Sequence, residues 1–270
     1  NYFEQEITFQ YSDIVVLISK AEKQHYISFG YDKYEAIPHV IYNSYKPKLD
    51  TDPWRPNYEL NDIGYIGRHV PRKRPDLPIF AVEKSGRKDV RVFNMGVDYK
   101  GEQGNPFWED LGRKHPKQLV IIPFSSNRET AHFYWKSIGA NSITGIYEPF
   151  GYTMCETLDR RVSAIVQNID GPSEITANVQ DSVFVYEVDQ DFDKDVDNFL
   201  VATNNFWDTH ADDRKAMAEH ARTALDDFRP EVIKLKWKEI LLNAQPRKIT
   251  GLATDQKTQK TTKGYGGYGN

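Results

Sequence analysis

The segment "SITGIYEPFGYTMCETLDRRVSAIVQNI", residues 142–169, decides the fold. It begins and ends with short apolar runs, 142–147 and 163–169, which are rich in isoleucine and valine and alternate only weakly. Strands that are buried on both faces have this composition. A helical stretch at 151–159 separates the two runs. A strand, a helix and a second strand in this order predict a βαβ unit and therefore a parallel sheet.

The same alternation extends over the chain from residue 62 onwards. Further strands are expected at 62–67, 90–96, 119–124 and 182–188, and further helices near 75–85, 105–113, 128–138, 172–178 and 191–206. Repeated βαβ units predict an α/β fold, a doubly wound parallel sheet of the Rossmann-like kind. In such a sheet the ligand-binding loops lie at the carboxyl ends of the strands.

Three parts are expected along the chain. Residues 1–45 have the pattern of the end of a preceding α/β unit and a crossover, and residues 46–244 form the main domain. Residues 245–270 lack aliphatic periodicity and are rich in Lys, Thr, Gln and Gly, which is typical of a flexible polar tail.

Two helical stretches are expected to close the main domain as a packing pair. In the second, which begins at Pro230, one face carries the apolar residues Ile233, Trp237, Ile240 and Leu241. A stripe with this spacing is typical of a helix that packs against a core.

Composition excludes several classes of protein. A formal charge of -4 and an isoelectric point near 6.0 give no general case for nucleic-acid binding. No apolar run approaches the roughly 20 residues that a membrane span requires. The single cysteine, Cys155, excludes an intramolecular disulfide and fits a reducing compartment, so we expect a cytoplasmic protein. We interpret Cys155 as a small buried side chain and not as a nucleophile.

A basic loop is the first candidate site. In "YIGRHVPRKRPD", residues 65–76, a strand is expected to end at Gly67. Five basic side chains follow within seven positions: Arg68, His69, Arg72, Lys73 and Arg74. At the carboxyl end of a strand, such a loop suits a phosphate or diphosphate group. The alternative is a solvated run of charge.

A second candidate is "EPFGYTMCE", in which two carboxylates, Glu148 and Glu156, flank the start of a helix. Gly151 would let the backbone approach a ligand, and the free N–H groups of the first helical turn can bind an anion. Two carboxylates in different elements can accept hydrogen bonds from hydroxyls on two parts of one ligand. The alternative is a pair of unrelated surface glutamates.

The stretch "DGPSEIT", residues 170–176, repeats the arrangement with Gly171 and Glu174, although ordinary helix capping gives the same pattern. The loop at 123–129 is a weaker candidate of the same kind. Motifs of other classes, such as GxGxxG, the P-loop, GxSxG, HExxH and CxxC, do not occur, so no metal site is expected.

Together these motifs resemble the carboxyl-terminal, donor-binding domain of retaining GT-B glycosyltransferases, the glycogen-synthase-like and sucrose-synthase-like group. That pattern has a strand ending in Gly-Arg with a Lys five residues later, then Glu-x7-Glu with Phe-Gly, then Gly-x-x-Glu. The matching residues are Gly67, Arg68 and Lys73, then Glu148, Phe150, Gly151 and Glu156, then Gly171 and Glu174. The resemblance covers roughly residues 8 to 242. It departs from the family at 157–163, which is bulkier and more charged than usual.

The resemblance implies roles for these residues. Arg68 and Lys73 would hold the nucleotide diphosphate and neutralise the departing phosphate. Glu148 would accept hydrogen bonds from the donor sugar, and Glu156 from the ribose. The backbone facing the ligand would be that of Phe150, Gly151 and Tyr152, with Gly171 and Glu174 completing the pocket.

The function implied is the transfer of a hexose from a UDP-sugar to a hydroxyl acceptor, with retained configuration and no metal or cofactor. The family also has an amino-terminal domain, which would be supplied in cis or in trans. Two alternatives stay open: a non-catalytic subunit that binds sugar nucleotides, and a transferase that acts on modified bases of viral DNA.

Overall fold

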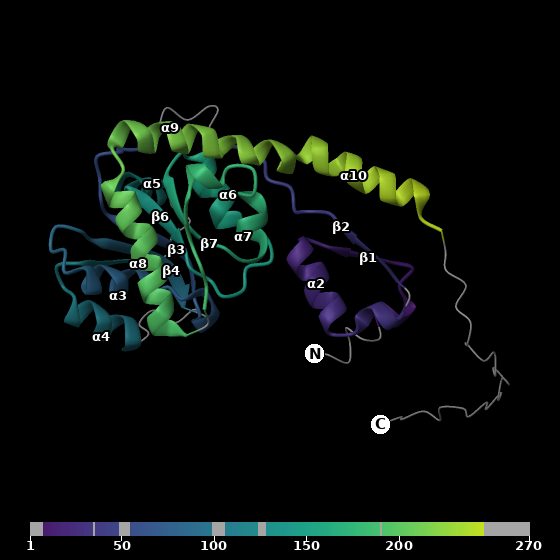
Figure 1. Ribbon diagram of the computed structural model, residues 1–270, viewed down its shortest axis with the longest axis horizontal. Helices are drawn as coiled ribbons and strands as arrows, with labels where there is room; N and C mark the ends of the chain where they lie inside the picture. Colours follow the sequence, from purple (N-terminus) through teal and green to yellow (C-terminus); the bar gives the residue numbers. More distant parts are fainter. Residues whose placement is uncertain are drawn as a thin grey trace, which may run out of the picture.

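The computed structural model describes residues 8–34, 36–48, 55–98, 106–123, 128–189 and 191–245. Its main domain is built on a six-stranded sheet with the order β5-β4-β3-β6-β7-β8, in which every adjacent pair of strands is parallel (Figure 1). The strands are β3 (Ile63–His69), β4 (Val92–Asp98), β5 (Leu119–Pro123), β6 (Ala140–Ile143), β7 (Ser163–Gln167) and β8 (Phe184–Tyr186). The predicted α/β, doubly wound parallel sheet is confirmed.

Helices cover both faces of this sheet. They are α3 (Leu77–Ser85), α4 (Pro106–Lys114), α5 (Arg128–Ser137), α6 (Tyr152–Asp159), α7 (Asp170–Ile175) and α8 (Phe192–Asp208). Two further helices follow, α9 (Ala211–Ala221) and α10 (Pro230–Asn243). The apolar residues of α3, α4 and α8 form one core cluster with the sheet. Those of α6 and α7 join a second cluster, and those of α5 a third. Two-sided burial explains the nearly continuous apolar runs of the strands.

The order of the strands reverses between β3 and β6. From β3 the chain builds β4 and then β5 on one side, and it then returns to place β6 against the other side of β3. In open α/β sheets, the crevice beyond the carboxyl ends of the strands at this reversal is where ligands bind. The candidate site is therefore expected above the ends of β3 and β6.

Several predicted strand boundaries were wrong: β4, for example, ends two residues later than expected, and β8 is confined to Phe184–Tyr186. Two of the differences lie at this crevice. β6 ends at Ile143, four residues earlier than expected, because the hydroxyl of Thr144 donates to the carbonyl of Lys73 at 2.8 Å. β3 continues to His69 instead of ending at Gly67, because it stays in register with the long strand β4. Arg68 and His69 therefore belong to a strand, and the basic loop proper begins after them.

A smaller unit precedes the main domain. It contains β1 (Ile14–Leu17), α2 (Lys20–Ser28) and β2 (Ile37–Val40), and the two strands form a separate parallel pair. In Figure 1 this unit lies beside the main domain, on the side of α6 and α7. The predicted tail, apart from residue 245 itself, and most of the loop at 123–129 lie outside the described residues.

The second closing helix, α10, was expected to pack along its whole apolar stripe. Ile233 is buried, but Trp237 is 41% and Leu241 68% exposed. The expectation was therefore wrong for the second half of the helix. Figure 1 shows why: α10 extends beyond the six-stranded domain, so its far end has no part of that core to pack against.

Candidate functional site

A cavity of about 220 Å³ lies where the fold predicts a ligand, at the ends of β3 and β6. Four segments line it: the end of β3, the basic loop at Lys73, the end of β6 with the loop that follows it, and the first turn of α6. The lining includes Gly67, Arg68, Lys73, Glu148 and Thr153. The structure thus brings the basic motif and the first glutamate of the Glu-x7-Glu motif to one place.

Lys73 and Glu148 form an ion pair at the wall of this cavity, although they are 75 positions apart in the chain. Their side chains are only 15% and 22% exposed. Burial lowers the pKa of Lys73 below its ordinary value, and the nearby Glu148 carboxylate acts in the opposite direction. The pair is therefore only partly screened by water, and an anionic ligand here would meet a strong local field.

Hydrogen bonds lock the basic loop onto the loop that carries Glu148. The N–H of Ile146 donates to the carbonyl of Arg72 at 2.9 Å, and the guanidinium of Arg72 donates to the carbonyl of Tyr147 at 3.1 Å. Arg72 therefore holds the other loop and does not point freely into solvent. Arg68, by contrast, is exposed at the rim of the cavity, where it can meet a ligand.

The helix predicted after Gly151 is α6, which begins at Tyr152. Gly151 has a φ of 104°, a left-handed conformation that favours glycine. As the N-cap residue it has no side chain to accept the N–H groups of the first turn, so these groups stay open to an anion. Thr153 of this turn lines the cavity. The side chain of Phe150 is buried against Phe228, and its backbone packs against Gly171. Phe150, Gly151 and Tyr152 are not among the residues that line the cavity.

Asp170 is a site residue that the sequence reasoning missed. Its carboxylate accepts the N–H of Glu148 at 3.0 Å, and the N–H of Gly171 donates back to the carbonyl of Glu148 at 3.0 Å. A Cβ atom on Gly171 would overlap the backbone of Phe150. The first two residues of α7 therefore hold the backbone of the Glu148 loop in place. An acidic residue directly after a strand and before Gly-Pro is the signal that could have pointed to it.

Glu174 lies away from the cavity. Its carboxylate accepts the N–H groups of Lys20 and Ala21, at 2.9 and 2.7 Å, and the hydroxyl of Tyr42 at 2.6 Å. The backbone groups belong to the first turn of α2, whose positive dipole end favours a carboxylate. Glu174 thus joins the main domain to the amino-terminal unit. The rings of His25, on α2, and Tyr147 are 5.6 Å apart at the same junction.

Glu156 lies on α6 one turn beyond Thr153, and it is not among the residues that line the cavity. Burial raises the pKa of Glu156, while Lys48 and Arg160 act in the opposite direction. It therefore lies beside the segment that connects the amino-terminal unit to the main domain. Cys155, next to it, is fully buried, so the interpretation as a small buried side chain is confirmed, and burial raises the pKa of its thiol.

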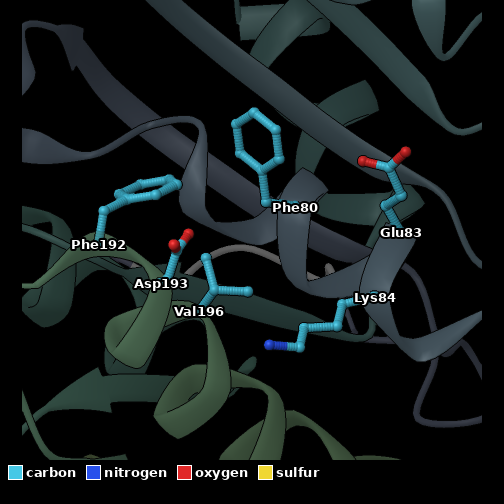
Figure 2. Close-up of a pocket in the computed structure, with 6 residues that line it drawn as sticks. All are labelled: Phe80, Glu83, Lys84, Phe192, Asp193 and Val196. Atoms are coloured by element: carbon cyan, nitrogen blue, oxygen red, sulfur yellow. The ribbon is translucent and has the colours of Figure 1, made fainter.

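A second, larger cavity of about 310 Å³ lies between α3 and α8 (Figure 2). Figure 2 shows Phe80 and Phe192 beside it, with the carboxylates of Glu83 and Asp193. Lys84 is the one cation among its lining residues, and it pairs with Asp197. Two carboxylates and one cation line this cavity, and it lies between two helices and not at the switch point of the sheet, so the smaller cavity is the candidate site.

Within the described residues, no group of three or more His, Cys, Asp or Glu side chains could hold a metal ion. In the same part of the chain, no helix is both long and apolar enough to cross a membrane.

The fold and the place of the cavity define the class of domain: a Rossmann-like α/β domain that matches one half of a GT-B fold. TarM from S. aureus, in a complex that contains UDP, gives a TM-score of 0.66 at 16% identity over 87% of this chain and 46% of TarM. Sucrose-phosphate synthase from Thermosynechococcus elongatus gives 0.69 at 15% identity over 88% of this chain and 60% of the synthase.

The pneumococcal O-GlcNAc transferase GtfA, in complex with UDP and GlcNAc, gives a TM-score of 0.70 at 13% identity. The match covers 90% of this chain and 47% of GtfA. The chain therefore spans about half the length of these similar proteins, and at such identities the similarity shows the fold alone. No family model and no characterised protein matches the chain by sequence.

Proposed function

We propose that this chain is the donor-binding part of a glycosyltransferase that uses a nucleoside diphosphate sugar, with UDP as the nucleotide. The observation that carries the proposal is the Lys73–Glu148 pair, which lines a cavity at the switch point of the sheet. A cation and a carboxylate side by side in one cavity match the two parts of a sugar diphosphate, the phosphates and the sugar hydroxyls. The similar proteins TarM and GtfA, whose structures contain UDP, support this choice of ligand.

The ion pair opens when the donor binds. Lys73 then contacts the diphosphate together with Arg68 and the first-turn N–H groups of α6, and Glu148 accepts hydrogen bonds from sugar hydroxyls. As the bond between the anomeric carbon and the phosphate oxygen breaks, negative charge grows on the leaving diphosphate. The two cations and the helix N-terminus stabilise that charge, so the site requires no metal ion.

We propose that the configuration of the sugar is retained, in line with the resemblance of the motifs. The acceptor hydroxyl then attacks from the face that the diphosphate leaves, and the leaving phosphate takes the proton of the hydroxyl. No side chain has to act as a nucleophile. The chain's own residues bind the diphosphate, orient the sugar and stabilise the departing charge.

A further α/β domain, in cis or in trans, would supply the acceptor side. The resemblance of the motifs supports this, because that family carries its acceptor site on an amino-terminal domain. We expect the 270-residue chain to bind UDP but to transfer sugar poorly by itself, because catalysis requires both reactants to be held together. Robust transfer by the chain alone would contradict this part of the proposal.

Isothermal titration calorimetry of the 270-residue chain with UDP, uridine and a panel of nucleotide sugars tests the proposal. UDP should bind much more tightly than uridine, because the cations contact the diphosphate. A non-catalytic subunit would bind the same ligands but stay inactive when the complementary domain is added. If no nucleoside diphosphate and no nucleotide sugar binds, the proposed function is wrong.

A further inference from the structure

Arg74 follows Lys73 directly but points to a different part of the molecule. Its backbone is left-handed, with a φ of 42°, which is unusual for a residue other than glycine. Its side chain is buried and forms an ion pair with Asp195, which lies in the first turn of α8 and is fully buried. The chain therefore turns sharply between a lysine that faces the cavity and an arginine that faces the interior.

The surroundings of this pair fix it firmly. The carboxylate of Asp195 also accepts the N–H of Asp189 at 2.6 Å. The guanidinium of Arg74 lies 5.7 Å from the ring centre of Phe192. Phe192 in turn packs edge-on against Phe80 at 5.5 Å, and both rings are visible in Figure 2. The first turn of α8 therefore anchors the arginine through both charge and packing.

The sheet fixes the backbone of the same turn. The hydroxyl of Thr144 lies 2.8 Å from the carbonyls of both Lys73 and Arg74, and the side-chain amide of Asn94 donates to the carbonyl of Pro75 at 2.9 Å. A buried ion pair is costly to desolvate, and well-packed apolar side chains of similar size often stabilise a fold as well or better. The value of this pair is thus better explained by the geometry it imposes than by stability.

We propose that Asp195 is a positioning residue for the donor site: by holding Arg74, it maintains the left-handed turn that directs Lys73 into the cavity. The inference rests on the proposed function, because it assigns Lys73 to the diphosphate. It adds a residue in α8 that lies 122 positions away in the chain from Lys73 and takes no part in the sequence motifs. Asp195 acts through Arg74 and does not touch the ligand.

The test compares Asp195→Asn with Asp62→Asn as a matched control. Asp62 is also a buried carboxylate paired with an arginine, Arg91, but it lies at the opposite, amino-terminal edge of the sheet. Calorimetry should show UDP affinity about tenfold lower in Asp195→Asn, the loss of one charged hydrogen bond, with uridine affinity unchanged. Asp62→Asn should lower the thermal stability but leave the ratio of UDP affinity to uridine affinity as in the wild type.

A second readout does not depend on the ligand. In ¹³C-dimethylated protein, the Lys73 resonance, assigned by its absence in Lys73→Arg, should titrate at lower pH than other lysines. The pKa of Lys73 measured in this way should return towards the ordinary range in Asp195→Asn but not in Asp62→Asn. If wild-type protein binds no UDP, the proposed function fails, and this titration still decides whether Asp195 positions Lys73.

A double variant keeps the test decisive if Asp195→Asn does not fold. Arg74→Gly combined with Asp195→Asn removes the unpaired cation and places a glycine in the left-handed turn, where it carries no steric cost. This variant should fold, and because glycine permits the turn without fixing it, UDP binding should still be weaker than in the wild type. Wild-type UDP affinity and an unchanged Lys73 titration in a folded Asp195 variant overturn the inference, as does an equal loss in Asp62→Asn.

Discussion

The carboxylate of Asp170 accepts the backbone N–H of Glu148 at 3.0 Å, so the residue proposed to hold the sugar is itself held by a residue 22 positions later. Asp170 has a φ of 55°, which an aspartate tolerates better than most residues. The contact fixes the backbone of Glu148 and so determines where its side chain lies. It uses neither carboxylate oxygen of Glu148, so both can contact Lys73 and a ligand.

Variants at Asp170 can distinguish the effect of its left-handed backbone from the effect of its hydrogen bond. Asp170→Gly keeps the left-handed backbone but loses the acceptor, and it should weaken UDP-sugar binding about three- to tenfold, the effect of one hydrogen bond. Asp170→Asn keeps an acceptor oxygen and should stay close to the wild type. Calorimetry with UDP and UDP-sugar checks this, and UDP affinity should not change in either variant. Equal behaviour of the two variants would contradict a role for the hydrogen bond.

The Lys73–Glu148 pair leads to opposite expectations for its two partners. Glu148→Gln frees Lys73 for the diphosphate, so UDP affinity should stay equal or rise while UDP-sugar affinity or kcat falls. Lys73→Met should lower the affinity for UDP about ten- to a hundredfold, because a charge-assisted contact to phosphate is lost. Lys84→Met, which removes a lysine outside the cavity, is the control for net charge. A clear loss of UDP affinity in Glu148→Gln would refute the division of roles.

The lowered pKa of Lys73 predicts how UDP binding depends on pH. The diphosphate adds negative charge beside the ammonium group, so binding must raise the pKa of Lys73 and take up protons in alkaline solution. Affinity should be full while Lys73 is protonated in the free protein, and it should fall as pH rises through its depressed pKa. Calorimetry in buffers of different ionisation enthalpy measures the proton uptake. Lys73→Arg, which stays charged, should show none from this position.

Glu156→Gln should have opposite effects on stability and on binding. Burial raises the pKa of Glu156 in the folded chain, so its stabilising contribution is complete at low pH and is lost as pH rises through that pKa. At neutral pH the variant should therefore have a higher Tm, by roughly 2 °C, and the difference should vanish near pH 4. If Glu156 binds the ribose, UDP and UDP-sugar affinity should fall together. Thermal unfolding at several pH values and calorimetry measure the two effects, and a lower Tm at neutral pH would contradict the first.

Much of the fold could be predicted because it depends on local pattern. Buried parallel strands are apolar throughout, so a run such as 163–169 was enough to predict the strand β7. The glycine before α6 was recognised as a turn residue in the same way. The end of β6 could not be predicted in this way. It depends on a hydrogen bond from Thr144 to Lys73, which are far apart in the chain but close in space.

The candidate site shows the same limit. Arg68, Lys73 and Glu148 were predicted from motifs, and the structure gathers them around one cavity. Glu174 looked like an ordinary capping residue, but it caps a helix 153 positions earlier in the chain, a pairing that no local pattern contains. Asp195 gave no signal, since its partner and its burial arise only when α8 packs on the sheet.

The short helix α7 contacts both the loop of Glu148 and the amino-terminal unit. Its first residue, Asp170, holds the loop of Glu148, and Glu174, less than two turns later, holds the start of α2. A rotation of the amino-terminal unit would pull on one end of this helix and move the support of Glu148 at the other. The contacts of the amino-terminal unit and the support of Glu148 therefore share one short helix.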